Sequence, residues 1–235
     1  MNSWDKLKAI AFDLDGTLID SAPDLIAATQ GALKELSLPS CSEQQVRSWI
    51  GNGAKVLMQR ALTHSLSEPV SQDVLDNAMP VFMRHYEANL QQHSQLYPGV
   101  LEVLAKLSEL GYSMAVVTNK PHRFAVPLLA AFNIGHHFTE VLGGDSLEKM
   151  KPDPLPLTHL LAKWQLAPEV LLMVGDSKND ILAAKAAGIS SIGLTYGYNY
   201  GEDIGLSSPD AVCEQFCDIL KFVNNSVRVM EHESV

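Results

Sequence analysis

The amino-acid sequence predicts an α/β fold in which a doubly wound, mostly parallel sheet carries an inserted all-helical segment. Three observations support this prediction. The apolar run at residues 7–12 ends in two aspartates, as a buried parallel strand does where it reaches a site. Residues 21–92 show only the helical spacing of apolar positions. From residue 97 onward, helices alternate with short apolar strands, which is typical of βαβ units.

Size and charge narrow the class of protein. The 235 residues suit one main domain with a smaller insertion, and the net charge is −10 with no cluster of Lys and Arg. This charge argues against binding to nucleic acid or anionic lipid, because both require clustered cations. No stretch reaches the roughly 20 apolar residues that cross a membrane, and the N-terminus lacks a signal-peptide pattern. We therefore expect a cytoplasmic monomer or homodimer without membrane or nucleic-acid partners.

Two helix starts follow the first strand. Ser21 and Asp24 have the spacing of a capping box, in which the two side chains bond to the backbone at the start of a helix. Apolar residues then recur with helical spacing over residues 25–36. Ser42 and Gln45 have the capping-box spacing before a second helix. We therefore expect helices that begin at these two boxes.

The rest of the inserted segment is also expected to be helical. Gly51-Asn52-Gly53 breaks the pattern before a helical run over residues 56–62. A last apolar stripe extends over residues 75–90. Pro80 lies inside this stripe and should kink or interrupt the helix, because proline lacks an N–H and clashes with the preceding turn.

The second half of the sequence alternates between helix and strand. Helices are expected at residues 100–110, 126–132, 157–164 and 181–187, and strands at residues 114–117, 141–142, 171–174 and 191–194. The order predicts a Rossmann-like core of residues 1–20 and 93–235, with a helical cap of residues 21–92. Both connections of the cap lie beside the first strand, which would let the cap open and close over the strand ends.

Polar side chains lie at or just beyond the ends of predicted strands. They form four groups: Asp13 with Asp15, Thr118 with Asn119, Lys151, and Asp176 with Asp180. In open α/β sheets ligands bind at this end of the strands. Asp13 directly continues a buried apolar run, where an unpaired carboxylate is costly. A metal or a cation is therefore expected beside it.

Each group alone has a simpler structural explanation. Asp-x-Asp and the Thr118-Asn119 pair are typical of turns, and Lys151 could be a solvated loop lysine. Asp180 could be an acid at a helix N-terminus that complements the helix dipole. Their joint placement at strand ends favours a chemical role over these alternatives.

Four motifs resemble those of the haloacid-dehalogenase superfamily. They are DLDGT at residues 13–17, VVTN at 116–119, KPDP at 151–154 and GDSKND at 175–180, and the match spans nearly the whole chain. The resemblance implies that Asp13 is a nucleophile that forms an aspartyl-phosphate. It also implies that Asp15 acts first as an acid and later as a base. The presence of Asp15 favours phosphate chemistry over dehalogenation.

The resemblance further implies a metal ion. Its ligands would be the carboxylates of Asp13 and Asp176 and the backbone carbonyl of Asp15, with Asp180 supporting the metal or the lysine. Four aspartates face one lysine, Lys151, so a dianionic phosphate would be repelled without a cation. Hard carboxylate ligands beside a phosphate favour Mg²⁺, with Mn²⁺ as an alternative.

Three groups are expected to hold the phosphate. By the same resemblance they are the Thr118 hydroxyl, the Asn119 backbone amide and Lys151. Lys120 and His122 follow directly in the sequence, but their spacing assigns them no role.

Three further segments, at residues 48–62, 117–121 and 193–202, resemble bacterial phosphoglycolate phosphatases. The resemblance implies hydrolysis of a small phosphorylated metabolite, 2-phosphoglycolate, to glycolate and phosphate. Alternatives with the same site are a phosphatase for pyrophosphate, a sugar phosphate or a nucleotide, and a phosphomutase. A non-catalytic phosphate-binding protein on the same fold is a further alternative.

The substrate carboxylate should require an anion-binding group in the cap. Gly51, Asn52 and Gly53 could present backbone N–H groups to it, and Arg47 or Lys55 could add positive charge. An interhelical turn with two surface cations is an equally good explanation of the same residues.

Overall fold

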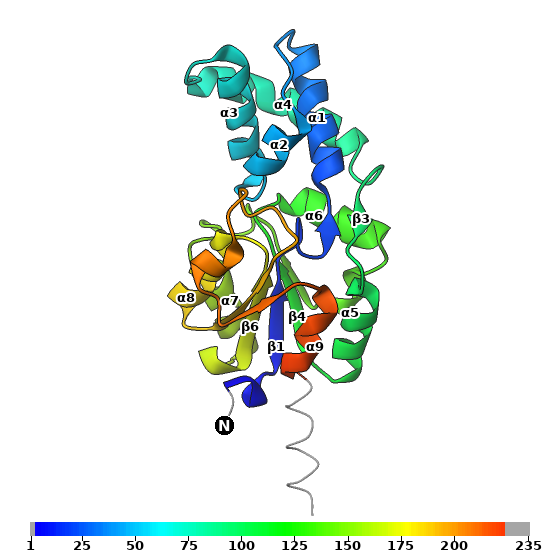
Figure 1. Ribbon diagram of the computed structural model, residues 1–235, viewed down its shortest axis with the longest axis vertical. Helices are drawn as coiled ribbons and strands as arrows, with labels where there is room; N and C mark the ends of the chain where they lie inside the picture. Colours follow the sequence, from blue (N-terminus) through cyan, green and yellow to red (C-terminus); the bar gives the residue numbers. More distant parts are fainter. Residues whose placement is uncertain (1–2, 224–235) are drawn as a thin grey trace, which may run out of the picture.

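The computed structural model describes residues 3–223, and its centre is a six-stranded parallel sheet (Figure 1). The strands stand in the order β5 (Glu140–Leu142), β4 (Ser113–Val117), β1 (Ala9–Phe12), β6 (Leu171–Gly175), β7 (Ser190–Leu194) and β8 (Ala211–Cys213). Phe12 at the end of β1 is in register with Val116 of β4 and Val174 of β6. The carboxyl ends of these strands therefore meet at one edge, and the predicted α/β class is confirmed.

Helices cover both faces of the sheet. Ile10 and Phe12 of β1 belong to one core cluster, whereas Ala9 and Ala11 belong to another on the opposite face. The helices that contribute to the first cluster are α5 (Val100–Glu109), α6 (His122–Ala131) and α9 (Leu220–Val223). Those that contribute to the second are α7 (Leu155–Trp164) and α8 (Lys178–Ala187). Because β1 is buried on both sides, its sequence is apolar throughout.

The inserted segment forms a separate layer of helices beyond one end of the sheet (Figure 1). These helices, called the helical unit below, are α1 (Ala22–Glu35), α2 (Glu43–Trp49), α3 (Gly53–Leu66) and α4 (Gln72–Ala88). They pack around their own hydrophobic cluster, which includes Leu33, Met58 and Phe82. The sheet and its covering helices are called the core below. Within residues 3–223, no helix is long and apolar enough to cross a membrane.

The two connections between the core and the helical unit lie side by side. β2 (Ile19–Asp20) pairs antiparallel with β3 (Gln95–Leu96), a pair that the sequence pattern did not predict. Short 3₁₀ helices complete the described structure, at Ser3–Lys6, Gly135–His137, Pro168–Val170, Ile204–Ser207 and Phe216–Ile219. Two adjacent strands of two residues each give the helical unit a compact attachment to the core.

One of the two expected capping boxes is wrong. The Ser21 hydroxyl donates to Asp15 Oδ1 at 2.5 Å and makes no cap for α1. The Asp24 carboxylate accepts hydrogen bonds from the backbone N–H groups of His93 and Ser94, at 2.9 Å each. The competing partners lie in distant segments, so tertiary contacts replace the local cap. The box at Ser42 and Gln45 is confirmed.

Pro80 does not interrupt its helix, because α4 continues through it. The proline is exposed, so the Asp76 carbonyl that loses its helical partner lies where water can bond to it. Leu75, Phe82 and Tyr86 of the same helix are buried in the helical unit. Packing of this face holds the helix together across the proline.

Candidate active site

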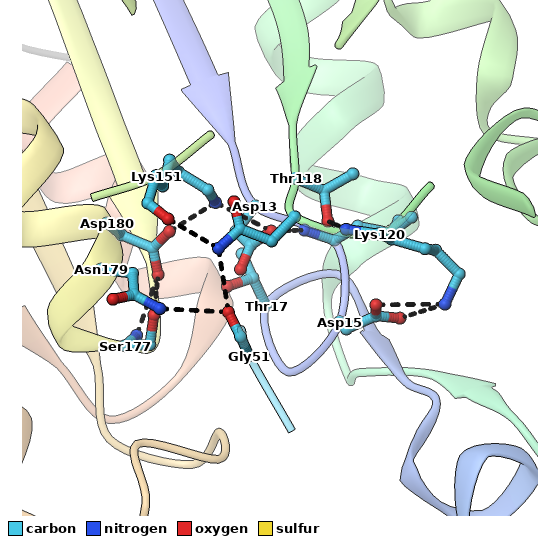
Figure 2. A network of polar contacts seen from close by, with 12 residues as sticks. Asp13, Asp15, Thr17, Gly51, Thr118, Lys120, Lys151, Ser177, Asn179 and Asp180 are labelled. Carbon is cyan, nitrogen blue, oxygen red and sulfur yellow. Dashed lines mark hydrogen bonds and ion pairs between the residues drawn. The ribbon is translucent and has the colours of Figure 1, made fainter. Parts of the chain in front are cut away.

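Asp13 lies directly after β1 and is almost fully buried. Its Oδ1 accepts a hydrogen bond from the backbone N–H of Leu14 at 2.7 Å, and the Lys151 ammonium lies 3.0 Å from the same oxygen. Lys151, only 2% exposed, also donates to Asp180 Oδ1 at 2.5 Å (Figure 2). One buried lysine therefore bridges two buried carboxylates from different strand ends.

Asp176 follows β6 and is held from two sides. Its Oδ1 accepts from the Thr17 hydroxyl and its Oδ2 from the backbone N–H of Tyr198, both at 2.7 Å. Asp180 lies in the first turn of α8, where its Oδ2 accepts from the backbone N–H and the hydroxyl of Ser177. Asp180 therefore serves as a helix-start acid and as a partner of the buried lysine.

Asp13, Asp176 and Asp180 form an acidic cluster, whose carboxylate oxygens come within 4.8 Å of one another. Burial raises the pKa of Asp13 to about 7, although Lys151 lowers it. Burial and the neighbouring carboxylates also raise the pKa of Asp176. Burial lowers the pKa of Lys151, but the two carboxylates beside it outweigh this effect and raise the pKa above its ordinary value. Buried oxygen ligands with excess negative charge fit a hard divalent cation.

Asp15 lies away from this cluster and pairs with a second buried lysine (Figure 2). Lys120 Nζ is 2.8 Å from Asp15 Oδ1 and 3.1 Å from Oδ2, and it also donates to the hydroxyl of Tyr86 in α4. Sequence reasoning assigned no role to Lys120. Its position two residues after Thr118, at the same strand end, was the available signal.

Thr118 and Asn119 follow β4 and are both buried. The Thr118 Oγ1 accepts from the backbone N–H of Lys120 at 3.2 Å. The Asn119 side-chain amide donates to the carbonyls of Lys151 at 2.8 Å and Gly51 at 3.0 Å. Its buried Oδ1 has no hydrogen-bond partner among the described residues. Asn119 thus links the lysine loop to the start of α3.

The Gly51–Gly53 loop docks on the core through its backbone. The Gly51 carbonyl accepts from Asn119 and from the Asn179 side chain. Gly53 has a φ of +81°, and a Cβ there would lie 3.1 Å from the Asn119 carbonyl oxygen, so a side chain would be strained in conformation and crowded. Asn52 contacts Asn179, whereas Lys55 is exposed on α3. The structure therefore brings Gly51 and Gly53, but not Lys55, to the strand ends.

A small pocket of about 30 Å³ lies between the core and the helical unit. Its core lining is Asp13, Asp15, Thr118, Asn119, Lys120 and Pro121. Its lining from the helical unit is Leu25, Ile50, Gly51, Gly53, Ala54, Leu57 and Tyr86. Residues that are distant in sequence thus surround one space, and Asp13 belongs both to this lining and to the acidic cluster.

The loop after β7 fastens the helical unit to this site. Tyr198 donates from its hydroxyl to Asp20 at 2.5 Å and accepts from the backbone N–H of Ala22 at 3.1 Å. Its own backbone N–H holds Asp176. The hydroxyl of Tyr196 donates to the Thr17 carbonyl at 2.8 Å. One loop therefore contacts the acidic cluster and the start of α1 together.

Known proteins share this arrangement of elements. The chain matches the family model of haloacid dehalogenase-like hydrolases over residues 10–194. It is 48% identical to a phosphoglycolate phosphatase of Vibrio parahaemolyticus, covering 92% of this chain and 96% of the relative. It is 49% identical to a phosphoglycolate phosphatase of Pectobacterium atrosepticum, with 94% of each chain covered.

A solved structure shows the same likeness in three dimensions. The crystal structure of a predicted phosphoglycolate phosphatase from Haemophilus somnus superposes with a TM-score of 0.89 at 47% identity. The superposition covers 92% of this chain and 97% of that chain. From the family match, the relatives and the shared fold, we conclude that the chain belongs to the family of haloacid dehalogenase-like hydrolases.

Proposed function

We propose that this protein is a Mg²⁺-dependent phosphatase that hydrolyses 2-phosphoglycolate to glycolate and phosphate, with the phosphoryl group carried on Asp13. The observation that carries the proposal is the small pocket in which Asp13 and Asp15 lie together with Thr118 and Asn119. The curated relatives at 48% and 49% identity are both named phosphoglycolate phosphatase, which supports the substrate.

In the first step, a carboxylate oxygen of Asp13 attacks phosphorus in line, and the bond from phosphorus to the glycolate oxygen breaks. Asp15 gives its proton to this departing oxygen, so glycolate leaves as a neutral alcohol at that end. Lys151 offsets negative charge beside Asp13, and the Thr118 hydroxyl and the Asn119 backbone amide donate to the phosphate oxygens.

In the second step, water attacks the phosphorus of the aspartyl-phosphate, and the bond between phosphorus and Asp13 breaks. Asp15, now ionised, takes the proton of the attacking water. The enzyme returns to its starting state with one water consumed and phosphate released. One carboxyl group thus serves as acid and then as base, a contribution typically worth about 10²–10⁴ in rate.

The donor set at the acidic cluster suits Mg²⁺. We assign the carboxylates of Asp13 and Asp176 and the backbone carbonyl of Asp15 as its ligands. When bound, the ion would offset the charge on the phosphate. The Lys151 ammonium lies closer to Asp180 Oδ1, at 2.5 Å, than to Asp13 Oδ1, at 3.0 Å, which supports a role for Asp180 in positioning the lysine.

The helical unit is proposed to be a cap, residues 21–92, on a catalytic core of residues 1–20 and 93–235. Gly51 and Gly53 from this unit line the pocket, which supports contact between the loop and the substrate. A closed cap would exclude water from the phosphorus during the first step.

Phosphate release from a panel of substrates tests the assignment. The purified protein with Mg²⁺ should release free phosphate from 2-phosphoglycolate with a higher kcat/KM than from pyrophosphate, glucose 6-phosphate or a nucleoside monophosphate. Chelation of the metal should abolish the release. A preference for the sugar phosphate would contradict the substrate and leave the mechanism intact. Transfer of phosphate to another hydroxyl, without free phosphate, would indicate a mutase.

Replacement of the nucleophile tests the mechanism. Asp13→Asn keeps the shape of the side chain and should lower kcat at least about a thousandfold, because the amide cannot accept the phosphoryl group. Asp73→Asn, at an exposed position of α4, is the matched control and should retain wild-type rates. Undiminished hydrolysis by the Asp13 variant would contradict the proposal. If the wild type binds phosphate without hydrolysing any ester, a non-catalytic binding role is indicated.

A further inference from the structure

Lys120 is a buried cation at the junction of three elements. Lys120 is only 4% exposed, and it lies in the loop after β4. Its ammonium contacts both carboxylate oxygens of Asp15 and the hydroxyl of Tyr86 in the helical unit. Figure 2 shows Lys120 and Asp15 apart from the other buried lysine, Lys151, which points to Asp13 and Asp180. The site therefore holds two lysines in separate places.

Lys120 is also the cation that faces the pocket. Among the described residues that line this space, it is the only one with a positive charge. A buried ammonium is costly unless an anion accompanies it. In this structure that anion is Asp15, at 2.8 Å. Any movement of Asp15 toward the substrate would leave Lys120 in need of another anion.

The proposed substrate places its carboxylate close to Asp15. In 2-phosphoglycolate, a single carbon separates the ester oxygen from the carboxylate. Asp15 must reach that ester oxygen to protonate it, so the carboxylate has to lie within a few ångströms of Asp15. Lys120 already contacts Asp15 and lines the same pocket. It is the cation best placed for that carboxylate.

An exchange of partners would give Lys120 an anion and would also let Asp15 reach the ester oxygen. Both oxygens of Asp15 face Lys120, an arrangement that keeps them from the leaving oxygen. A substrate carboxylate that takes over Lys120 would free Asp15 to take up a proton from solvent and to turn toward the ester, where it gives that proton to the leaving oxygen. The Tyr86 hydroxyl accepts from Lys120 and keeps its own hydrogen for a second bond to the carboxylate.

We propose that Lys120, together with the Tyr86 hydroxyl, binds the carboxylate of the substrate and so determines specificity. The site then selects phosphate esters whose carboxylate lies one carbon from the ester oxygen. This inference rests on the proposed function, and it assigns the selection to the core loop after β4 as well as to the helical unit.

Two substrates that differ in the carboxylate test the proposal. Wild type and Lys120→Met are compared on 2-phosphoglycolate and on ethyl phosphate, which has the same two-carbon skeleton without the carboxylate. The ratio of the two kcat/KM values should fall about a hundredfold or more in Lys120→Met, as expected for loss of a buried charge pair. Tyr86→Phe should lower the same ratio by a smaller factor, and Lys120→Arg should restore part of it.

A binding measurement separates recognition from chemistry. In the Asp13→Asn background, Lys120→Met should weaken calorimetric binding of 2-phosphoglycolate and leave binding of inorganic phosphate within about twofold. Lys55→Met is the matched comparison, because Lys55 is exposed on α3 outside the pocket lining. For Lys55→Met, the ratio of kcat/KM for 2-phosphoglycolate to kcat/KM for ethyl phosphate should equal that of the wild type.

The outcomes divide clearly. Equal losses for both substrates in Lys120→Met, with unchanged 2-phosphoglycolate binding, would mean that Lys120 acts only through Asp15 and would overturn the inference. A fall in the ratio of the two kcat/KM values in Lys55→Met, but not in Lys120→Met, would also overturn the inference. A wild type without preference for 2-phosphoglycolate over ethyl phosphate contradicts the proposed function first, and the inference with it. If Lys120→Met does not fold, Lys120→Arg and Tyr86→Phe decide the question.

Discussion

At the scale of single residues, one buried lysine accompanies two buried carboxylates. Lys151 is 3.0 Å from Asp13 and 2.5 Å from Asp180, and all three are nearly inaccessible to water. Removal of one partner from a buried ion pair leaves an uncompensated charge, which costs far more than the loss of a surface pair. The stability of the site therefore depends on this residue.

Lys151→Met should lower the free energy of unfolding by roughly 3–5 kcal/mol in metal-free buffer, measured by urea denaturation. The reference variant is Lys163→Met, which breaks the ion pair between Lys163 and Glu140, where the lysine is 50% exposed. It should change the free energy by less than about 1 kcal/mol. Similar values for both variants would show that the buried pairs carry no special stability.

The raised pKa of Asp13 predicts how stability depends on pH and metal. Its ordinary value is 3.8 and its folded value is about 7, so the metal-free folded state binds the proton more tightly than the unfolded state. The resulting stabilisation is complete below about pH 4 and is lost as the pH rises through 7. Mg²⁺ prefers the ionised carboxylate, so its stabilising effect should increase over the same range.

The measurement is the melting temperature at pH 5 and at pH 8, with and without about 10 mM Mg²⁺. The increase in melting temperature caused by Mg²⁺ should be several degrees larger at pH 8 than at pH 5. For a chain of this size, each kcal/mol of added stability raises the melting temperature by roughly 2–4 °C. Sodium chloride at matched ionic strength controls for screening. Equal increases at both pH values would rule out Asp13 as the titrating ligand.

At the scale of elements, the loop after β7 sets the position of Asp176. Gly197 lies against this carboxylate, and a Cβ at residue 197 would come within 2.1 Å of Asp176 Oδ2. Any side chain there must displace the aspartate, whose Oδ2 also accepts from the N–H of Tyr198. The loop therefore shapes the acidic cluster without contributing a carboxylate to it.

Gly197→Ala should raise the Mg²⁺ concentration needed for half-maximal activity by about 10–100-fold, as for other changes that misplace a ligand. The melting-temperature increase caused by Mg²⁺ should shrink in parallel. Gly135→Ala serves as the control, because a Cβ there meets atoms no closer than 3.7 Å. An unchanged Mg²⁺ requirement in Gly197→Ala would contradict the proposed role of Asp176.

At the scale of the whole molecule, Tyr198 joins the core to the helical unit. It starts from a loop of the core, yet its side chain belongs to the hydrophobic cluster of the helical unit. Its hydroxyl holds Asp20 and the N–H of Ala22, next to the paired connections β2 and β3. The two parts thus share one residue where the chain passes between them.

Tyr198→Phe should lower the free energy of unfolding by about 1–3 kcal/mol, because the N–H of Ala22 loses its partner. Hydrogen–deuterium exchange should accelerate at the start of α1 and at residues 93–96. Tyr196→Phe removes a hydrogen bond to Thr17 instead, so its faster exchange should stay near residues 16–18. Uniform acceleration in both variants would contradict a local attachment role for Tyr198.

Much of the fold could be predicted because its signals are local. The apolar run before Asp13 and the alternation after residue 97 depend only on neighbouring residues, and both correspond to elements of the observed sheet. The Ser42 box is confirmed for the same reason. The strand β8 and the β2–β3 pair were not predicted. Strands of two or three residues carry little periodicity, and of these short strands only β5 was expected, at residues 141–142.

The sequence by itself determined the fold class and the chemical character of each strand end, because hydrophobic periodicity and residue type are properties of short segments. Only the tertiary structure decided which side chains meet. Lys120 pairs with Asp15 across 105 residues and with Tyr86 across 34, and Asp24 bonds to Ser94 rather than capping its own helix. Such pairings depend on how distant elements pack, and no local pattern records that packing.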